Sequence, residues 1–197
     1  MRGRNKMAIN KQLKLDKSGG IDIEPDSYVG LLVGVVHIGS HKNEYQGKTS
    51  IVDQLALQLE LQDLLTQKGT PVTVTKIMRN SMKSKASLIA FAEAMGADLE
   101  NGIDFDKLIG KPVLVEMGFN QAKTKVGVKG FSKLPKTLKA TVKPLMGTPK
   151  VFLDVDELTE GHIKELPEWL QKLVNERVRG EMPFDQGEDG EVSSVDL

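Results

Sequence analysis

The chain has no cysteine among its 197 residues. This absence excludes disulfide bonds and thiolate nucleophiles, and it removes the sulfur ligands of most structural zinc sites. Long apolar runs are missing too: the longest covers residues 29–36, whereas a membrane span needs about 20 apolar residues. The basic residues 1–10 are not followed by the apolar stretch of a signal peptide. We therefore expect a protein of a reducing cytoplasm with no membrane partner.

Net charge is also absent, because 27 Lys and Arg balance 27 Asp and Glu. The balance conceals an uneven distribution along the chain. Residues 67–90 hold five basic residues and no acidic one, and residues 111–150 hold nine lysines and one acid. Residues 151–197 reverse the sign, with four basic and thirteen acidic residues. A basic body followed by an acidic end is the first indication of function.

Two patterns that often mark ligand sites are incomplete in this chain. The segment GKTS at 47–50 resembles the end of a phosphate-binding loop, but Lys42 stands where that loop needs a glycine. The loop should also open a helix, whereas residue 49 is expected to begin a strand. His37, His41 and His162 have no cysteine or carboxylate pair nearby in the sequence to complete a metal site. We therefore expect no cofactor and no metal.

Acid–base catalysis has little support, because acidic residues are scarce in the middle of the chain. Asp53 and Glu60 are the remaining candidates, and each is interpreted more simply as an exposed strand residue. A catalytic carboxylate pair must be held rigidly and tuned by burial, which an acidic terminus does not provide. We expect that the protein is not an enzyme.

The spacing of apolar residues predicts five strands, at 28–38, 49–61, 71–78, 113–119 and 125–130. Glycines at 30 and 34 indicate a bulge or sharp coiling in the first strand. A helical period predicts a helix over 84–95, with Ser84 as its N-cap and Gly96 at its C-terminal cap. A second amphipathic helix is expected over 159–179, broken at Pro167.

Three strands, a helix and a hairpin are typical of an OB-fold barrel. We predict a mainly β fold with minor α content, an OB-like five-stranded barrel with one internal helix and a C-terminal helix. An α+β domain of another topology fits the same pattern. The expected organisation is a flexible basic arm at 1–27, an OB-like domain at 28–155, a C-terminal helix packing on it at 156–179 and a disordered acidic tail at 180–197.

The basic residues gather at the junction of the third strand with the helix and around the last hairpin. Lysine clusters neutralise phosphates without reading base sequence, and single-strand binding adds aromatic platforms for the bases. Aromatic residues make up only 5% of the chain, so few platforms are available, and Phe119 and Phe131 fit a core role equally well. The candidate DNA-binding residues are Tyr45, Lys48, Lys76, Arg79, Lys83, Lys85, Phe119, Lys123, Lys125, Lys129 and Phe131.

Several segments resemble phage-encoded OB-fold single-stranded DNA-binding proteins. These are GVVHIG at 34–39, EYQGK at 44–48, PVTVTK at 71–76 with the helix that follows, LIGKPVLV at 108–115 and LPEWLQK at 166–172. They occur in the same order as in that family and span roughly residues 28–178. Residues 59–61 and 120–125 lack the aromatic residues expected there in the family.

The resemblance implies a domain that coats single-stranded DNA during phage DNA replication or recombination, in the host cytoplasm. The acidic tail at 180–197 is expected to compete with DNA for the binding surface or to dock replication and recombination proteins. The alternative is a protein-interaction module on an OB-like scaffold, which recruits such enzymes through the tail and the helix that carries Trp169.

Overall fold

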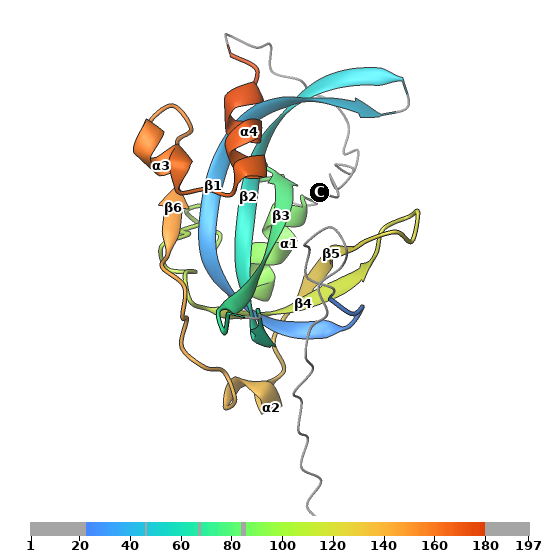
Figure 1. Cartoon of the computed structure of the whole chain (residues 1–197), viewed down its shortest axis with the longest axis vertical. Helices are drawn as coiled ribbons and strands as arrows, with labels where there is room; N and C mark the ends of the chain where they lie inside the picture. Colours follow the sequence, from blue (N-terminus) through green and yellow to red (C-terminus); the bar gives the residue numbers. More distant parts are fainter. Residues whose placement is uncertain (1–22, 46, 67, 84–85, 180–197) are drawn as a thin grey trace, which may run out of the picture.

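The computed structural model of the chain describes residues 23–179, apart from positions 46, 67, 84 and 85 (Figure 1). Among the described residues, no helix is long and apolar enough to cross a membrane. The elements, in order, are β1 (Ser27–Tyr45), β2 (Lys48–Leu65), β3 (Pro71–Arg79), α1 (Ser87–Ala94), β4 (Pro112–Phe119), β5 (Val126–Ser132), α2 (Lys136–Lys139), β6 (Lys150–Phe152), α3 (Glu160–Lys164) and α4 (Glu168–Glu176).

The strands form one sheet in the order β3-β2-β1-β4-β5, with the short β6 also pairing with β1. All pairs are antiparallel except β1–β6, which is parallel. β1 is long enough to hold two partners on one edge, with β4 along its first residues and β6 further on. The prediction of a mainly β fold with few helices is confirmed.

The sheet is open, which differs from the closed barrel expected from the sequence. β3 and β5 are its two ends, and no backbone ladder joins them in the described part of the chain. The ammonium of Lys76 on β3 reaches across and donates to the carbonyl oxygen of Val128 on β5 at 3.0 Å. The Lys76 side chain thus connects β3 with β5, where a closed barrel would have backbone hydrogen bonds between the two strands.

β1 is bent by two irregularities in its pairing with β2, at Leu32/Gly34 and at His37/Gly39. The bulge expected at Gly34 is therefore confirmed. A one-residue shift reverses which side chains face each side of a sheet. Consequently Leu32 and Val35, three residues apart, both face one hydrophobic core, while Val36 and Ile38 face the other.

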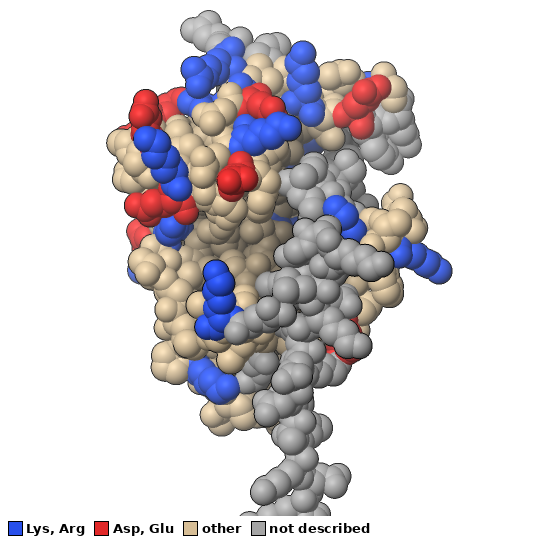
Figure 2. Space-filling view, viewed as in Figure 1, with Lys and Arg blue, Asp and Glu red and all other residues tan. Residues whose placement is uncertain are grey.

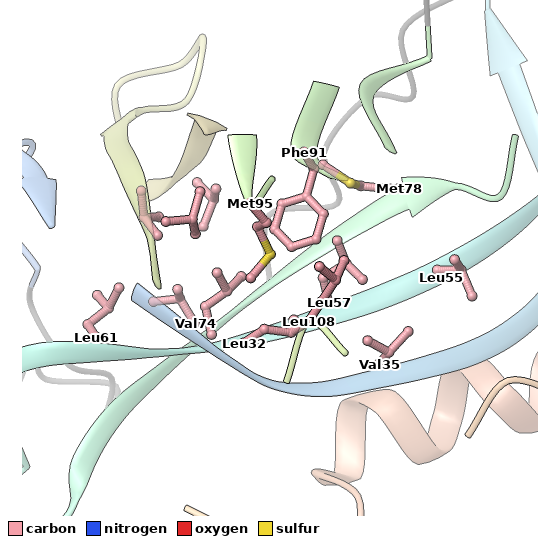
Figure 3. Close-up of a cluster of buried hydrophobic side chains, with 14 of the residues drawn as sticks. Leu32, Val35, Leu55, Leu57, Leu61, Val74, Met78, Phe91, Met95 and Leu108 are labelled. Atoms are coloured by element: carbon pink, nitrogen blue, oxygen red, sulfur yellow. The ribbon is translucent and has the colours of Figure 1, made fainter. Parts of the chain in front are cut away.

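The main core lies between the sheet and α1 (Figure 3). The leucines at 55, 57, 59 and 61 of β2 point to this side, as their shared parity predicts. Phe91 and Met95 close the core from above, and Phe91 is fully buried. α1 ends where Gly96 adopts the left-handed conformation, at φ 72°, so that prediction holds.

The start of α1 differs from the sequence-based expectation. Ala86, not Ser84, is the N-cap, and it makes no side-chain capping bond. Leu88 and Phe91 of α1 are buried, so packing rather than a side-chain cap stabilises this helix.

A second core lies on the opposite face of the sheet, under the C-terminal helices. Leu166, Leu170 and Val174 pack there against Val36 and Ile38 of β1. Pro167 separates α3 from α4, as a residue that begins a helix but cannot continue one. The stripe of α4 predicted from its spacing is the face that packs.

The face of β2 expected to be exposed is covered as well. Gln54, Gln58, Glu60 and Gln62 alternate with the core leucines and are nevertheless buried. Both carboxylate oxygens of Glu60 accept from the backbone N–H of Met146, and Gly147 N–H donates at 2.7 Å. The interpretation of Glu60 as an exposed residue is therefore wrong, because the irregular segment before β6 crosses over this strand.

Candidate nucleic-acid interface

The turn of the β4–β5 hairpin is held together by the side chain of Asn120. Its carbonyl oxygen accepts from the backbone N–H of Thr124 at 2.8 Å, and its amide donates to the Thr124 hydroxyl at 2.9 Å. The backbone N–H of Asn120 donates to the carbonyl oxygen of Lys125, and the N–H of Lys123 donates to the carbonyl oxygen of Asn120, which closes the same turn. Asn favours such local bonds in turns, which makes this a defined loop rather than a loose one.

Lys123 lies at the tip of this turn in the left-handed conformation, at φ 55°. Within the described residues it is the one non-glycine residue with positive φ. Non-glycine residues adopt this region at a cost, and such positions concentrate at functional sites. Lys123 and its neighbour Lys125 are both exposed.

Lys129 occupies a bulge in the pairing of β5 with β4. Glu116 faces Gly130 while Met117 faces Val128, so Lys129 is the extra residue. It is exposed, and its methylene chain lies across Gly118, where a Cβ atom would come within 2.9 Å of it. The bulge redirects this lysine away from the sheet and lets it cross the neighbouring strand.

The two phenylalanines of the β4–β5 hairpin lie in different environments, and the bulge explains the position of Phe131. Because it shifts the alternation, both Val128 and Phe131 face the main core, and the Phe131 ring meets Phe91 edge-on at 4.8 Å. Phe119 lies at the end of β4 and is 52% exposed. Phe119 is thus the aromatic residue of this hairpin that is open to a ligand, while Phe131 contributes to packing.

The basic residues of β3 do not form one cluster. Lys76 shares its row with the core residues Val74 and Met78, and its ammonium contacts β5. Arg79 has the opposite parity and pairs with Gln54, where β3 ends. Lys83 follows in the exposed loop before α1. Lys85 and the side chain of Tyr45 lie outside the described part of the structure.

Lys48 is exposed at the far end of the β1–β2 hairpin. Six residues of extended strand separate it from Gln54, a span of about 20 Å. Figure 1 shows this hairpin and the β4–β5 hairpin extending toward the same side of the molecule. The predicted residues therefore fall into three places: one hairpin tip, the end of β3, and the other hairpin.

The lysines of the β4–β5 hairpin differ from several other lysines of the described residues in their ionic contacts. In the described residues, Lys123, Lys125 and Lys129 make no ion pair, whereas Lys107, Lys164 and Lys172 each lie within 4 Å of a carboxylate. Figure 2 shows blue side chains at the end of this hairpin and mixed red and blue ones over α3 and α4.

His37 and Asp53 form a close pair that the sequence-based interpretation missed, with Nε2 of His37 2.7 Å from Oδ1 of Asp53. Burial raises the pKa of the Asp53 carboxyl, but the hydrogen bonds from the side chains of His37 and Asn80 outweigh this effect. The pKa therefore lies below its ordinary value of 3.8. In the register of β1 on β2, His37 pairs with Leu55 and Asp53 pairs with Ser40, so the two side chains meet diagonally across the irregularity at His37/Gly39.

No group of three His, Cys, Asp or Glu side chains close enough to hold a metal ion occurs among the residues that the structure describes. The sequence of the chain matches no protein-family model and no curated protein.

Proposed function

We propose that this protein binds single-stranded DNA without sequence preference, through the β4–β5 hairpin and the adjoining end of β3. The observation that carries the proposal is a hydrogen-bonded turn with Lys123 and Lys125, next to the bulged Lys129 and the exposed Phe119. None of these three lysines makes an ion pair with another described residue. Lysines of this kind neutralise successive phosphates, and Phe119 offers a face on which a base can stack. The contribution of Lys48 is expected to be smaller because it lies apart from the others.

An OB-like arrangement supports this proposal. The strand order, the single helix between β3 and β4, and the contact of Lys76 with β5 are compatible with an OB-like barrel whose last seam is bridged by a side chain. In such folds the connecting hairpins border the nucleic-acid surface. The segments that resemble phage proteins support a role in phage DNA replication or recombination in the host cytoplasm.

The test is a titration of fluorescent oligo-dT with the full chain at several salt concentrations. The triple variant Lys123→Asn, Lys125→Gln and Lys129→Gln removes three charges, and Asn is chosen at 123 because it tolerates the left-handed conformation. We expect affinity to fall at least about tenfold. The plot of log K against log salt should flatten by about 2, since each phosphate contact on a single strand contributes about 0.7.

The matched control changes the same number of charges elsewhere. Lys107→Gln, Lys164→Gln and Lys172→Gln remove lysines that lie beside carboxylates, so affinity and slope should stay near those of the unmodified protein. Equal effects of the two triple variants would contradict the assignment of the hairpin. If the unmodified protein fails to bind oligo-dT at low salt, the proposal is rejected in favour of a protein-interaction module.

A further inference from the structure

A chain of hydrogen bonds crosses the sheet where the β1–β2 hairpin leaves it. The backbone N–H of Val155 donates to Nδ1 of His37 at 3.2 Å, and the other ring nitrogen contacts Asp53. The side-chain amide of Asn80 donates to the second carboxylate oxygen of Asp53 at 2.8 Å. The backbone N–H of Asn80 also donates to the backbone oxygen of Asp53 at 2.8 Å. We call these four residues the relay.

Which group donates and which accepts in each hydrogen bond of the relay follows from the groups at its two ends, the backbone N–H of Val155 and the amide of Asn80. A backbone N–H can only donate, so Nδ1 of His37 carries a lone pair and Nε2 carries the ring proton. Nε2 therefore donates to Asp53, and each carboxylate oxygen of Asp53 accepts one side-chain donor. With every partner satisfied in a single pattern, a change at one end alters the bonds at the other.

The relay lies at a junction in the fold. β3 pairs with β2 only from Gln54 onward, where Gln54 faces Arg79, and beyond that point β1 and β2 continue as a two-stranded ribbon. Asp53 and Asn80 are the next residues on the two strands. The relay therefore fixes both the base of the ribbon and the place where the chain leaves β3 toward Lys83.

The other end of the relay belongs to the C-terminal unit, defined here as residues 150–179. Val155 is part of the second core. The chain after α4 also returns to β1, where the backbone N–H of Val178 donates to Ser40 at 2.8 Å. Arg177 packs against Gly39, whose φ of +81° and close neighbours leave no room for a side chain. The C-terminal unit thus contacts β1 on both sides of His37, through β6 before it and through Val178 after it.

We propose that the relay is a positioning device that aligns the basic end of β3 and the base of the β1–β2 hairpin for single-stranded DNA, and that couples both to the C-terminal unit. The inference rests on the proposed function. Loosening the unit withdraws the bond to His37 and frees Asp53 to turn, which releases Asn80. Because coupling is reciprocal, DNA held at the end of β3 strengthens the attachment of the unit.

A swap of two relay residues tests the positioning role. Asn80→Asp places two carboxylates in contact and breaks the relay. In Asp53→Asn with Asn80→Asp, the new amide donates to position 80 and still accepts from His37. We expect oligo-dT affinity to fall about fivefold to tenfold in the single variant, as for coupled sites. The double variant should return to within about twofold of the unmodified protein. Ser81→Asp, which adds the same charge one residue along, should weaken binding less than Asn80→Asp.

Hydrogen exchange at the backbone N–H of Val155 tests the coupling. Saturating oligo-dT should slow this exchange in the unmodified protein and should have little effect in Asn80→Asp, where the relay is broken. ¹⁵N spectra should also show His37 with its proton on Nε2, both with and without DNA. If these residues have a purely structural role, oligo-dT should not change the rate of hydrogen exchange at Val155.

The outcomes separate the two proposals. Absence of oligo-dT binding by the unmodified protein would reject the proposed function and with it the inference. Two results would overturn the inference alone, provided that the unmodified protein binds oligo-dT. One is an Asn80→Asp variant with unchanged affinity, and the other is Val155 hydrogen exchange that oligo-dT does not change. Failure of the double variant to recover affinity while its thermal unfolding matches that of the unmodified protein would also overturn it.

Discussion

At the scale of single residues, Glu60 is a carboxylate removed from water and satisfied by backbone. It is 2% exposed and receives the N–H groups of Met146 and Gly147. Glu60→Leu keeps the size but leaves these donors without an acceptor, at about 1–3 kcal/mol each. We expect the free energy of unfolding in urea to fall by about 2–4 kcal/mol, and by about 1 kcal/mol in Glu60→Gln, which retains one acceptor.

The exposed Glu116 on β4 provides the comparison for this prediction. Glu116→Gln should change the free energy of unfolding by no more than about 0.5 kcal/mol, as surface substitutions usually do. A Glu60→Leu variant as stable as the unmodified protein would show that the crossing segment does not depend on this carboxylate.

Asp53 makes stability depend on pH in the acidic range. Its pKa is lower in the folded chain than its ordinary 3.8, so the folded state binds fewer protons than the unfolded state near that pH. The stabilisation is present above the ordinary value and is lost as pH falls through the lowered one. We expect urea midpoints to decline on acidification below about pH 4, and to decline less in Asp53→Asn. Asp106→Asn, at an exposed position, should reproduce the slope of the unmodified protein.

At the scale of elements, α4 is a short helix that depends on packing. A helix of nine residues has little stability alone, and its attachment comes from side chains such as Leu170, which is fully buried in the second core. Leu170→Ala should lower the free energy of unfolding by about 2–4 kcal/mol through lost contacts and a cavity. Thermal or urea unfolding measures this, and Lys172→Ala on the exposed side of the same helix should have a small effect. Equal effects of the two substitutions would mean that α4 does not pack as described.

The elements also show how far sequence reasoning reaches. Local signals were sufficient to locate five of the strands, Gly96 at the end of α1 and the break at Pro167, because each depends on neighbours in the sequence. They did not predict that β1 continues past residue 38 to Tyr45, nor the short β6. The burial of Glu60 and the inward turn of Phe131 were not predictable. The first depends on a segment 87 residues away, and the second on a one-residue bulge in β5.

Part of the candidate site could likewise be predicted from the sequence, and part depends on contacts between distant residues. Exposed lysines in a polar turn follow from composition, so the exposure of Lys123 and Lys125 could be predicted from the sequence. Lys76 and Arg79 have opposite parity on β3, so their side chains lie on opposite faces of the sheet. The ammonium of Lys76 is hydrogen-bonded to Val128 of β5. His37 and Asp53 were dismissed individually, since their meaning lies in the register that brings them into contact.

At the scale of the whole molecule, β1 is the strand on which the other parts converge. It pairs with β2, β4 and β6, contributes to both cores, and meets the end of α4 through Ser40. The two parts of the proposed interface, the β4–β5 hairpin and the end of β3, belong to the sheet that this one strand joins together (Figure 1). Changes in the bend of β1 are therefore expected to affect both cores together.

The central place of β1 also bears on the order of events during synthesis. His37 is made 118 residues before Val155, and at about 5–20 residues per second this interval is on the order of ten seconds. Throughout that time Val36 and Ile38 lack the helices that cover them in the finished chain. β1 is thus synthesised before the other described elements, yet its apolar face is covered only after α4 has been made.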